Sequence, residues 1–409
     1  MPETDRVALA RYIIEYGSQA DEPTGRESMA ADAQPLAADA LGLAFPDGTK
    51  PAPIPFPDDM HPDNPLPEGD VLVVTWTVAE HQALADVITP NVPSRTWANY
   101  RRRYDDHYRP LIRNGAPAIK ANRLGSWCAS RIADKKLICF KSELHLNQDG
   151  IETGEGTATL PVKDLFRQLI DEVKPKLVIT VGTAGATFPP GAKTQLNGME
   201  CSPHQLGDVV ITRGAKFRLS QEFRKEAFAK TRYKCETFNI PTGRLAAAAE
   251  LLNVNASKLA EPAFGPPHTG YQWPNGVPIP GLKNAPDLKI DGRDFPAFHP
   301  ILTTDFFEFG TSTNALERDG CGVEMGDAVL GMVIEEMKAG GQVAPNWLVI
   351  RNASDPQING TLPNRDTPGV DPQLRRNLDM QAHWAVWYYE TYGYWTSVNS
   401  AIAVWAMVA

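Results

Sequence analysis

Short and almost uninterrupted apolar runs recur along the chain, and they constrain its fold more than any other feature of the sequence. Val71–Val74, Leu177–Val181 and Trp347–Ile350 are runs of this kind, which is typical of strands that are buried on both faces of a sheet. Segments that we expect to be helical, such as Ala79–Ile88 and Val162–Val173, lie between such runs. Strands that alternate with helices predict an α/β fold, in which helices cover both faces of a central, largely parallel sheet.

The remaining predicted elements follow the same pattern. Further strands are expected at Lys136–Phe140, Asp208–Thr212 and Leu302–Thr304, and further helices at Gly243–Leu252, Asp327–Met337 and from about Pro372 to Tyr392. Open parallel sheets bind their ligands at the carboxyl ends of the strands. A functional site is therefore expected where these strands end.

Two stretches of the chain differ from this pattern. Residues 1–68 form a proline-rich extension, in which a short helix is expected around Val7–Tyr16. Proline removes a backbone donor and fixes φ, so the run Asp47–Pro67 is expected to be extended and to lack regular structure. The segment Ala256–Pro300 is expected to be a long excursion. We therefore predict an extension (1–68) that wraps the main domain or a neighbouring subunit, and one domain spanning residues 69–409.

Charge and cysteine content argue against several classes of function. The net charge of -9 disfavours nucleic-acid binding as the main activity, because that activity normally needs a basic face. The five cysteines are scattered and include no CxxC pair, which favours reduced thiols in a cytoplasmic protein over a disulfide framework or a zinc site. His81 and His145 have no metal-ligand spacing and are interpreted as surface or core residues. No signal peptide is expected, and Glu390 and Asn399 interrupt the apolar C-terminal stretch, so no membrane span is expected there.

Polar and small residues gather at the predicted strand ends. Glu80 begins the helix after the first strand, where a carboxylate either complements the helix dipole or acts as a base in a half-apolar setting. The run Gly182–Gly185 (Gly-Thr-Ala-Gly) is either a tight turn or a place where the backbone approaches a ligand closely. The last buried strand is expected to end in Ser354 and Asp355, and the alternative for an isolated pair of this type is a turn or a cap.

Two more segments lie at predicted strand ends or helix starts. Phe307 lies in an aromatic turn after a strand, and core packing is the alternative to ligand contact there. Glu324 and Met325 precede a predicted helix, and Asp327 begins it. All these segments are expected at the same edge of the sheet.

In their order and placement, these segments resemble the nucleoside phosphorylase and nucleosidase superfamily, which includes purine nucleoside phosphorylases and methylthioadenosine/adenosylhomocysteine nucleosidases. The resemblance covers roughly Val71 to Tyr392. It implies a nucleoside phosphorylase-like fold, which is a single three-layer α/β/α domain with a central mixed, largely parallel sheet. It also implies a purine nucleoside or nucleotide as substrate, no metal or organic cofactor, and a homo-oligomer as the usual assembly.

The resemblance further implies a role for each residue of the candidate site. Asp355, oriented by Ser354, protonates the purine and so makes it a better leaving group. Glu80 holds and activates the attacking water. Phe307 stacks on the purine, a contact worth about 1–3 kcal/mol, and Met325 lies against the sugar. The substrate-binding set is completed by Thr183, Ala184, Gly185, Glu324 and Asp327.

The chain departs from the superfamily's pattern at two positions. Thr180 stands where the hexameric phosphorylases have an arginine that holds phosphate. Its absence favours hydrolysis over phosphorolysis, unless Arg213 or an arginine of a neighbouring subunit replaces it. Gly326 stands where the superfamily has a glutamate that accepts hydrogen bonds from the sugar 2′- and 3′-hydroxyls. Either Asp327 or Glu324 takes over this role, or the sugar is held differently.

Three hypotheses follow. The first is a purine nucleoside or nucleotide N-glycosidase, which hydrolyses the glycosidic bond to free base and sugar. The second keeps the fold and the purine substrate but uses phosphate as co-substrate. The third is a catalytically reduced domain that binds a nucleoside or nucleotide as a sensor. The base, the sugar and the 5′ substituent stay open.

Overall fold

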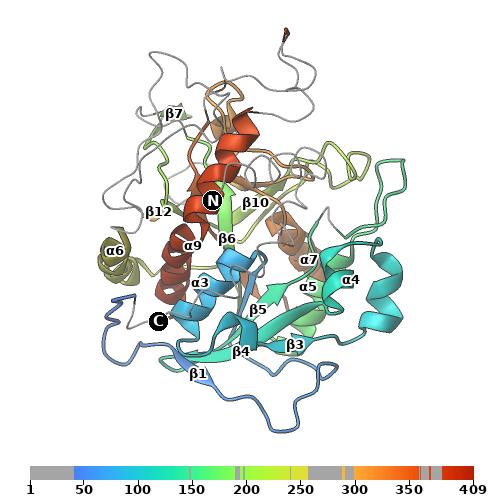
Figure 1. Cartoon of the computed structure of the whole chain (residues 1–409), viewed down its shortest axis with the longest axis vertical. Helices are drawn as coiled ribbons and strands as arrows, with labels where there is room; N and C mark the ends of the chain where they lie inside the picture. Colours follow the sequence, from blue (N-terminus) through green and yellow to red (C-terminus); the bar gives the residue numbers. More distant parts are fainter. Residues whose placement is uncertain are drawn as a thin grey trace.

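The computed structural model describes residues 41–146, 149–188, 194–196, 199–239, 241–256, 288–290, 299–358, 360, 368–369 and 380–409. Within these ranges, 13 strands form one sheet (Figure 1). Its main path runs through β1 (Ala52–Ile54), β4 (Gly125–Ile132), β5 (Lys135–Ser142), β2 (Val71–Thr75), β6 (Leu177–Gly185), β14 (Gly322–Glu324), β13 (Ile301–Thr303), β10 (Gly214–Phe217) and β11 (Arg232–Lys234). Beside this path lie β3 (Ala98–Tyr100), β9 (Val209–Thr212), β12 (Leu288–Ile290) and β15 (Asn346–Asp355). A separate ribbon consists of β7 (Thr194–Leu196) and β8 (Met199–Cys201).

The central strands of the sheet pair in parallel, and most of the antiparallel pairs involve strands on either side of them. β2 pairs in parallel with β5 and with β6, and β15 pairs in parallel with β6 along its whole length. β4 and β5 form an antiparallel hairpin, and β9 runs antiparallel to β15. The predicted α/β fold with a central mixed, largely parallel sheet is confirmed.

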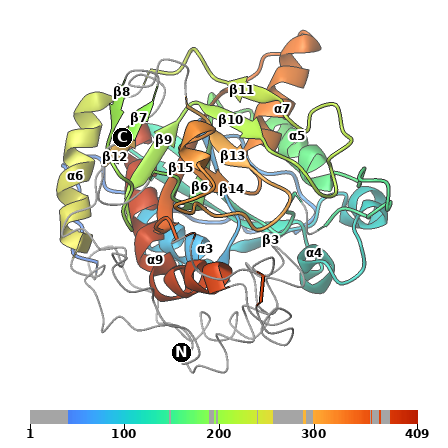
Figure 2. The same cartoon turned by 90° about the horizontal axis from the view of Figure 1, so that it is seen from above.

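Alternate residues of the central strands pack into two separate layers. On β2, Leu72 and Val74 belong to one hydrophobic core, and Val71 and Val73 belong to the other. The first core includes α5 (Pro161–Val173) and α7 (Asp327–Ala339), and the second includes α3 (Val78–Ile88), α6 (Thr242–Ala256) and α9 (Met380–Val408). Figure 2 shows the central strands between α3 and α9 on one side and α5 and α7 on the other. The domain therefore has three layers.

The predicted strands and helices that fall within the described ranges are present, but some are longer than predicted. β6 continues through Gly185, because it pairs with β15 as far as this residue, whereas β15 ends at Asp355 as predicted. α9 continues to Val408 instead of ending near Tyr392, because its last turns pack in the core beside α3. The strand β4 was not predicted, since its sequence mixes apolar residues with serine and arginine.

Residues 41–68 pack closely on the main sheet. β1 pairs antiparallel with β4, so the expectation that the proline-rich run lacks regular structure is wrong at this point. Leu41, Leu43 and Leu66 are buried, and the indole of Trp405 donates to the carbonyl of Thr49 (2.8 Å). The predicted helix near the N-terminus and most of the excursion before Pro300 lie outside the described residues. Within the described ranges, no helix has the length and apolarity needed to cross a membrane.

Candidate active site

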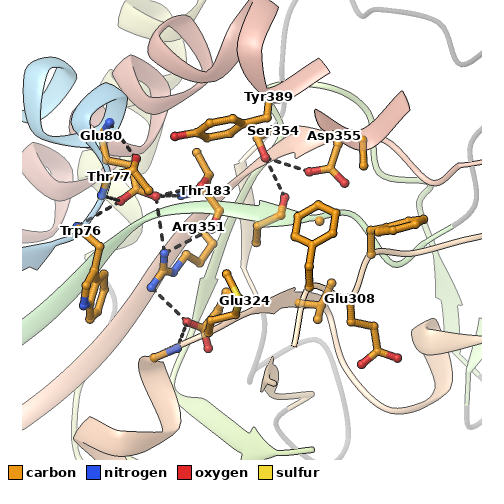
Figure 3. A pocket seen from close by; sticks show the side chains of 18 of the residues that line it. Trp76, Thr77, Glu80, Thr183, Glu308, Glu324, Arg351, Ser354, Asp355 and Tyr389 are labelled. Carbon is orange, nitrogen blue, oxygen red and sulfur yellow. Dashed lines mark hydrogen bonds and ion pairs between the residues drawn. The ribbon is translucent and has the colours of Figure 1, made fainter. Parts of the chain in front are cut away.

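A pocket lies at the carboxyl ends of the central strands, beneath one end of α9 (Figure 3). Its empty volume, which includes open solvent at the mouth, is about 800 Å³. The pocket brings together all but one of the predicted site residues: Glu80, Thr183, Ala184, Gly185, Phe307, Glu324, Met325, Ser354 and Asp355. The exception is Asp327, which is buried behind the wall and does not line the pocket.

Glu80 lies in the first turn of α3 and connects this helix to β6. Its Oε2 accepts hydrogen bonds from the backbone N–H groups of Thr77 (2.9 Å) and Trp76 (3.1 Å) and from the hydroxyl of Thr75 (3.1 Å). These contacts form part of a capping box, with Thr77 as the N-cap residue. Its Oε1 accepts from the backbone N–H (2.7 Å) and the hydroxyl (2.8 Å) of Thr183. Glu80 therefore caps a helix and also lines the pocket.

The contact between Glu80 and β6 requires glycine at position 182. A Cβ atom there would lie 2.3 Å from Oε1 of Glu80 and 2.6 Å from Nη1 of Arg351. Any side chain would push both groups away from the strand. This close approach explains the run of small residues Gly182–Gly185. The run is part of β6 and is not a turn.

Arg351, near the end of β15, lies among three carboxylates. Its Nε and Nη2 donate to the two oxygens of Asp327 at 2.9 and 2.6 Å, and Nη2 also reaches Glu324 at 3.3 Å. Nη1 lies 3.8 Å from Glu80. Burial lowers the pKa of Arg351, but the carboxylates of Asp327 and Glu324 outweigh this effect and raise it. The guanidinium carbon lies 5.0 Å from the centre of the Trp76 ring, within the distance of a cation–π contact.

Glu324 lines the pocket from the end of β14. Its carboxylate accepts from the backbone N–H groups of Gly326 (2.5 Å) and Asp327 (3.0 Å) and from the hydroxyl of Thr303. Burial and the charge of Asp327 raise the pKa of Glu324, and Arg351 opposes this rise. The carboxylate is thus held at the start of α7 by backbone donors, as anions commonly are at a helix N-terminus.

Asp355 occupies the opposite side of the pocket and has a different environment. The register between β15 and β6 shifts between Ala353 and Asp355, and bulges of this kind redirect side chains next to functional sites. The hydroxyl of Ser354 donates to Oδ1 of Asp355 (2.9 Å), while Oδ2 has no hydrogen-bond partner among the described residues. Burial raises the pKa of Asp355 to about 7, and the bond from Ser354 partly offsets this effect. Gly185 leaves room for Oδ2, which would lie 3.2 Å from a Cβ at that position.

Phe309, Tyr389 and His145, to which sequence reasoning gave no role in the site, also line the pocket. Phe307 and Phe309 lie with ring centres 5.5 Å apart, and Tyr389 of α9 lies above Ser354 (Figure 3). His145, which follows β5, is buried in the pocket wall, and its Nε2 has no hydrogen-bond partner among the described residues. Burial, assisted by the charge of Lys141, lowers the pKa of His145 to about 3.

The structure also places the two residues that the phosphorylase hypothesis concerns. Thr180 is buried in the middle of β6, with its hydroxyl 3.5 Å from the carbonyl oxygen of Leu348. Arg213 is buried as well, and its Nη1 donates to the carbonyl of Phe238 (2.9 Å). Neither residue lines the pocket, so Arg213 does not replace the missing arginine in this arrangement.

No family model and no curated protein matches the sequence. Among solved structures, the chain is similar to the 5′-methylthioadenosine/S-adenosylhomocysteine nucleosidase of Neisseria meningitidis in complex with methylthio-immucillin-A, with 15% identity, coverage of 83% of this chain and 98% of the other, and a TM-score of 0.40. Futalosine hydrolase of Helicobacter pylori shows 10% identity, coverage of 83% and 96%, and a TM-score of 0.39. The S-adenosylhomocysteine nucleosidase of Streptococcus pyogenes shows 11% identity, coverage of 84% and 97%, and a TM-score of 0.40.

The proteins named in these comparisons are two nucleosidases and futalosine hydrolase. Identities of 10–15% leave the substrate and the catalytic groups of this chain to be inferred from its own pocket.

Proposed function

We propose that the chain is a purine nucleoside N-glycosidase, in which water cleaves the bond between base and sugar. The observation that carries this proposal is the environment of Asp355. One carboxyl oxygen is fixed by Ser354, the other has no partner among the described residues, and burial raises the pKa of the group to about 7. Such a carboxyl group holds its proton near neutral pH and can donate it to a departing base, which contributes about 10²–10⁴-fold to the rate.

The order of the strands indicates how a nucleoside would lie in the pocket. The ends of β15, β6, β2 and β5 lie next to one another in the sheet in this order. Asp355 and Thr183 lie at the ends of β15 and β6. Glu80 follows β2, and His145 follows β5. Neighbouring strands are about 4.8 Å apart, so the four strand ends span roughly 14 Å. In this orientation the base lies between Asp355 and Phe307, the sugar lies over the end of β6, and the sugar's far end points toward His145.

Glu80 is the group that we assign to the attacking water. Its Oε1 faces the pocket together with the Thr183 hydroxyl. When this hydroxyl turns away, one acceptor site of Oε1 becomes available to a water molecule beside the sugar carbon C1′. The transition state of glycoside cleavage carries positive charge on the sugar, and the Glu80 carboxylate stabilises that charge.

Water is favoured over phosphate because the pocket offers no spare cation among its described lining residues. Arg351 carries the permanent positive charge there, and it is already paired with Asp327 and Glu324. His145 is neutral at physiological pH, because its pKa is lowered to about 3. A phosphate ion would instead meet the carboxylate of Glu80.

Base release from a panel of purine nucleosides and nucleotides, with and without phosphate and read by chromatography, tests the proposal. Free base without phosphate supports the nucleosidase. Release that requires phosphate would identify a phosphorylase instead. Binding of a nucleoside without release under either condition would replace the proposed enzyme with the sensor domain.

A further inference from the structure

The carboxylate groups beside the proposed sugar position have their acceptor capacity filled by the protein. Glu80 accepts from five donors, supplied by Thr75, Trp76, Thr77 and twice by Thr183. A carboxylate offers about four lone-pair sites. If the Thr183 hydroxyl turns away, the site that it releases is the one assigned above to the attacking water. Glu80 therefore has no further capacity for the paired hydroxyls of a ribose.

The other two carboxylates near this position are filled in the same way. Glu324 accepts from Thr303, Gly326, Asp327 and Arg351. Both oxygens of Asp327 are bound by the guanidinium of Arg351, and Asp327 does not line the pocket. Neither group is available to accept from a sugar hydroxyl without breaking a buried ion pair.

The indole of Trp76 fills the space that an acidic side chain at position 326 would need. A Cβ atom on Gly326 would lie 3.2 Å from Cζ2 and 3.5 Å from Cε2 of Trp76. The indole is fixed in this place, because its Nε1 donates to the carbonyl of Leu144 (3.1 Å) and its face lies over Arg351. This edge of the sugar position is therefore an apolar wall without an unoccupied acceptor.

We propose that the pocket selects 2′-deoxynucleosides, with the sugar's 2′ position against Trp76 and Gly326. The inference rests on the proposed nucleosidase function and specifies its substrate class. C2′ is bonded to C1′, the carbon that water attacks, and in the proposed orientation it lies on the side of Trp76. A 2′-hydroxyl at this wall would give up hydrogen bonds to water without replacement, which is unfavourable.

Known specificities give the size of the effect to expect. A site that hydrogen-bonds a substrate hydroxyl rejects the analogue without it by about 10⁴–10⁵-fold, whereas an apolar site rejects an added hydroxyl by only about 10²-fold. The pocket should therefore cleave 2′-deoxynucleosides more efficiently than ribonucleosides, with a preference of up to about a hundredfold.

The test compares kcat/KM for 2′-deoxyadenosine with adenosine, and for 2′-deoxyguanosine with guanosine, by chromatography of the released base. Faster cleavage of both deoxynucleosides than of their ribonucleosides supports the inference. Equal cleavage or any ribonucleoside preference overturns it while leaving the nucleosidase function in place. Absence of base release from all four compounds would overturn the proposed function, and the inference would fall with it.

A pair of matched variants tests the geometry directly. Trp76→Leu combined with Gly326→Glu opens the wall and introduces a carboxylate, and Trp76→Leu combined with Gly326→Gln is the uncharged control of the same size. The glutamate variant should shift the ratio of kcat/KM values toward ribonucleosides by about tenfold or more relative to the glutamine variant. Equal ratios in the two variants would show that position 326 does not face the sugar hydroxyls, and would overturn the inference.

Discussion

Replacement of Asp355 by asparagine is expected to remove most turnover and, at the same time, to stabilise the protein above neutral pH. Burial raises the pKa of Asp355 from 3.8 to about 7, so between these values the folded protein keeps a proton that the unfolded chain has lost. The free energy of unfolding therefore falls as the pH rises through this window, and the loss is complete above about pH 7. A shift of about 3 units at 1.36 kcal/mol per unit gives a penalty of about 4 kcal/mol.

Asparagine cannot ionise and so escapes this penalty. Its amide oxygen can keep the hydrogen bond from Ser354, but its amide N–H groups then take the place of Oδ2, which has no partner among the described residues. An unpaired buried donor costs about 1–3 kcal/mol. At pH 8 the variant should therefore be more stable than the wild type by about 1–3 kcal/mol, as the difference between these opposing effects. At pH 5 the advantage should be smaller or reversed.

Urea unfolding of both proteins at pH 5, 6, 7 and 8 measures this difference, and base release measures turnover. Asp305→Asn is a suitable control, because Asp305 is also buried but its carboxylate accepts from the backbone N–H groups of Ser220, Gln221 and Phe223. The control should be less stable than the wild type at every pH. A stability difference for Asp355→Asn that does not change with pH, or near-normal turnover, would refute the reasoning.

Three further predictions follow from the site. Above about pH 7, kcat/KM should fall about tenfold per pH unit, because Asp355 loses the proton that it donates; a pH–rate profile checks this. Gly182→Ala should lower turnover and cost about 1–3 kcal/mol in urea unfolding, because its Cβ would overlap Glu80. Arg351→Met should cost about 3–5 kcal/mol by leaving Asp327 without its partner, and Arg351→Lys should cost less in the same assay.

The central strands and Asp355's place at a strand end were predictable from the sequence. Buried parallel strands are apolar at nearly every position, so β2 and the first parts of β6 and β15 stand out. The continuation of β6 through Gly182–Gly185 was not predictable from local pattern. Those residues are small or polar, and they are strand residues because they pair with β15.

The charged centre of the site was less accessible to sequence reasoning. Arg351 follows directly on an apolar run, and a cation in that place is a signal that buried carboxylates surround it. The sequence does not identify those carboxylates, since Glu80, Glu324 and Asp327 come from three separate elements. The packing of Trp76 on Gly326 is likewise set by the tertiary fold, because the two residues lie 250 positions apart in the sequence.

The two carboxyl groups assigned to the chemistry differ in the way that acid and base roles require. Every contact of Glu80 is one in which its oxygens accept, and a guanidinium lies 3.8 Å away. Asp355 has one donor, no ion pair among the described residues, and a pKa near 7. A site that contains two titratable groups in such different environments can supply both a proton acceptor and a proton donor at the same pH. Arg351 holds Glu324 and Asp327 in place. In the proposed arrangement, Trp76 and Gly326 then determine which sugar fits between Glu80 and Asp355.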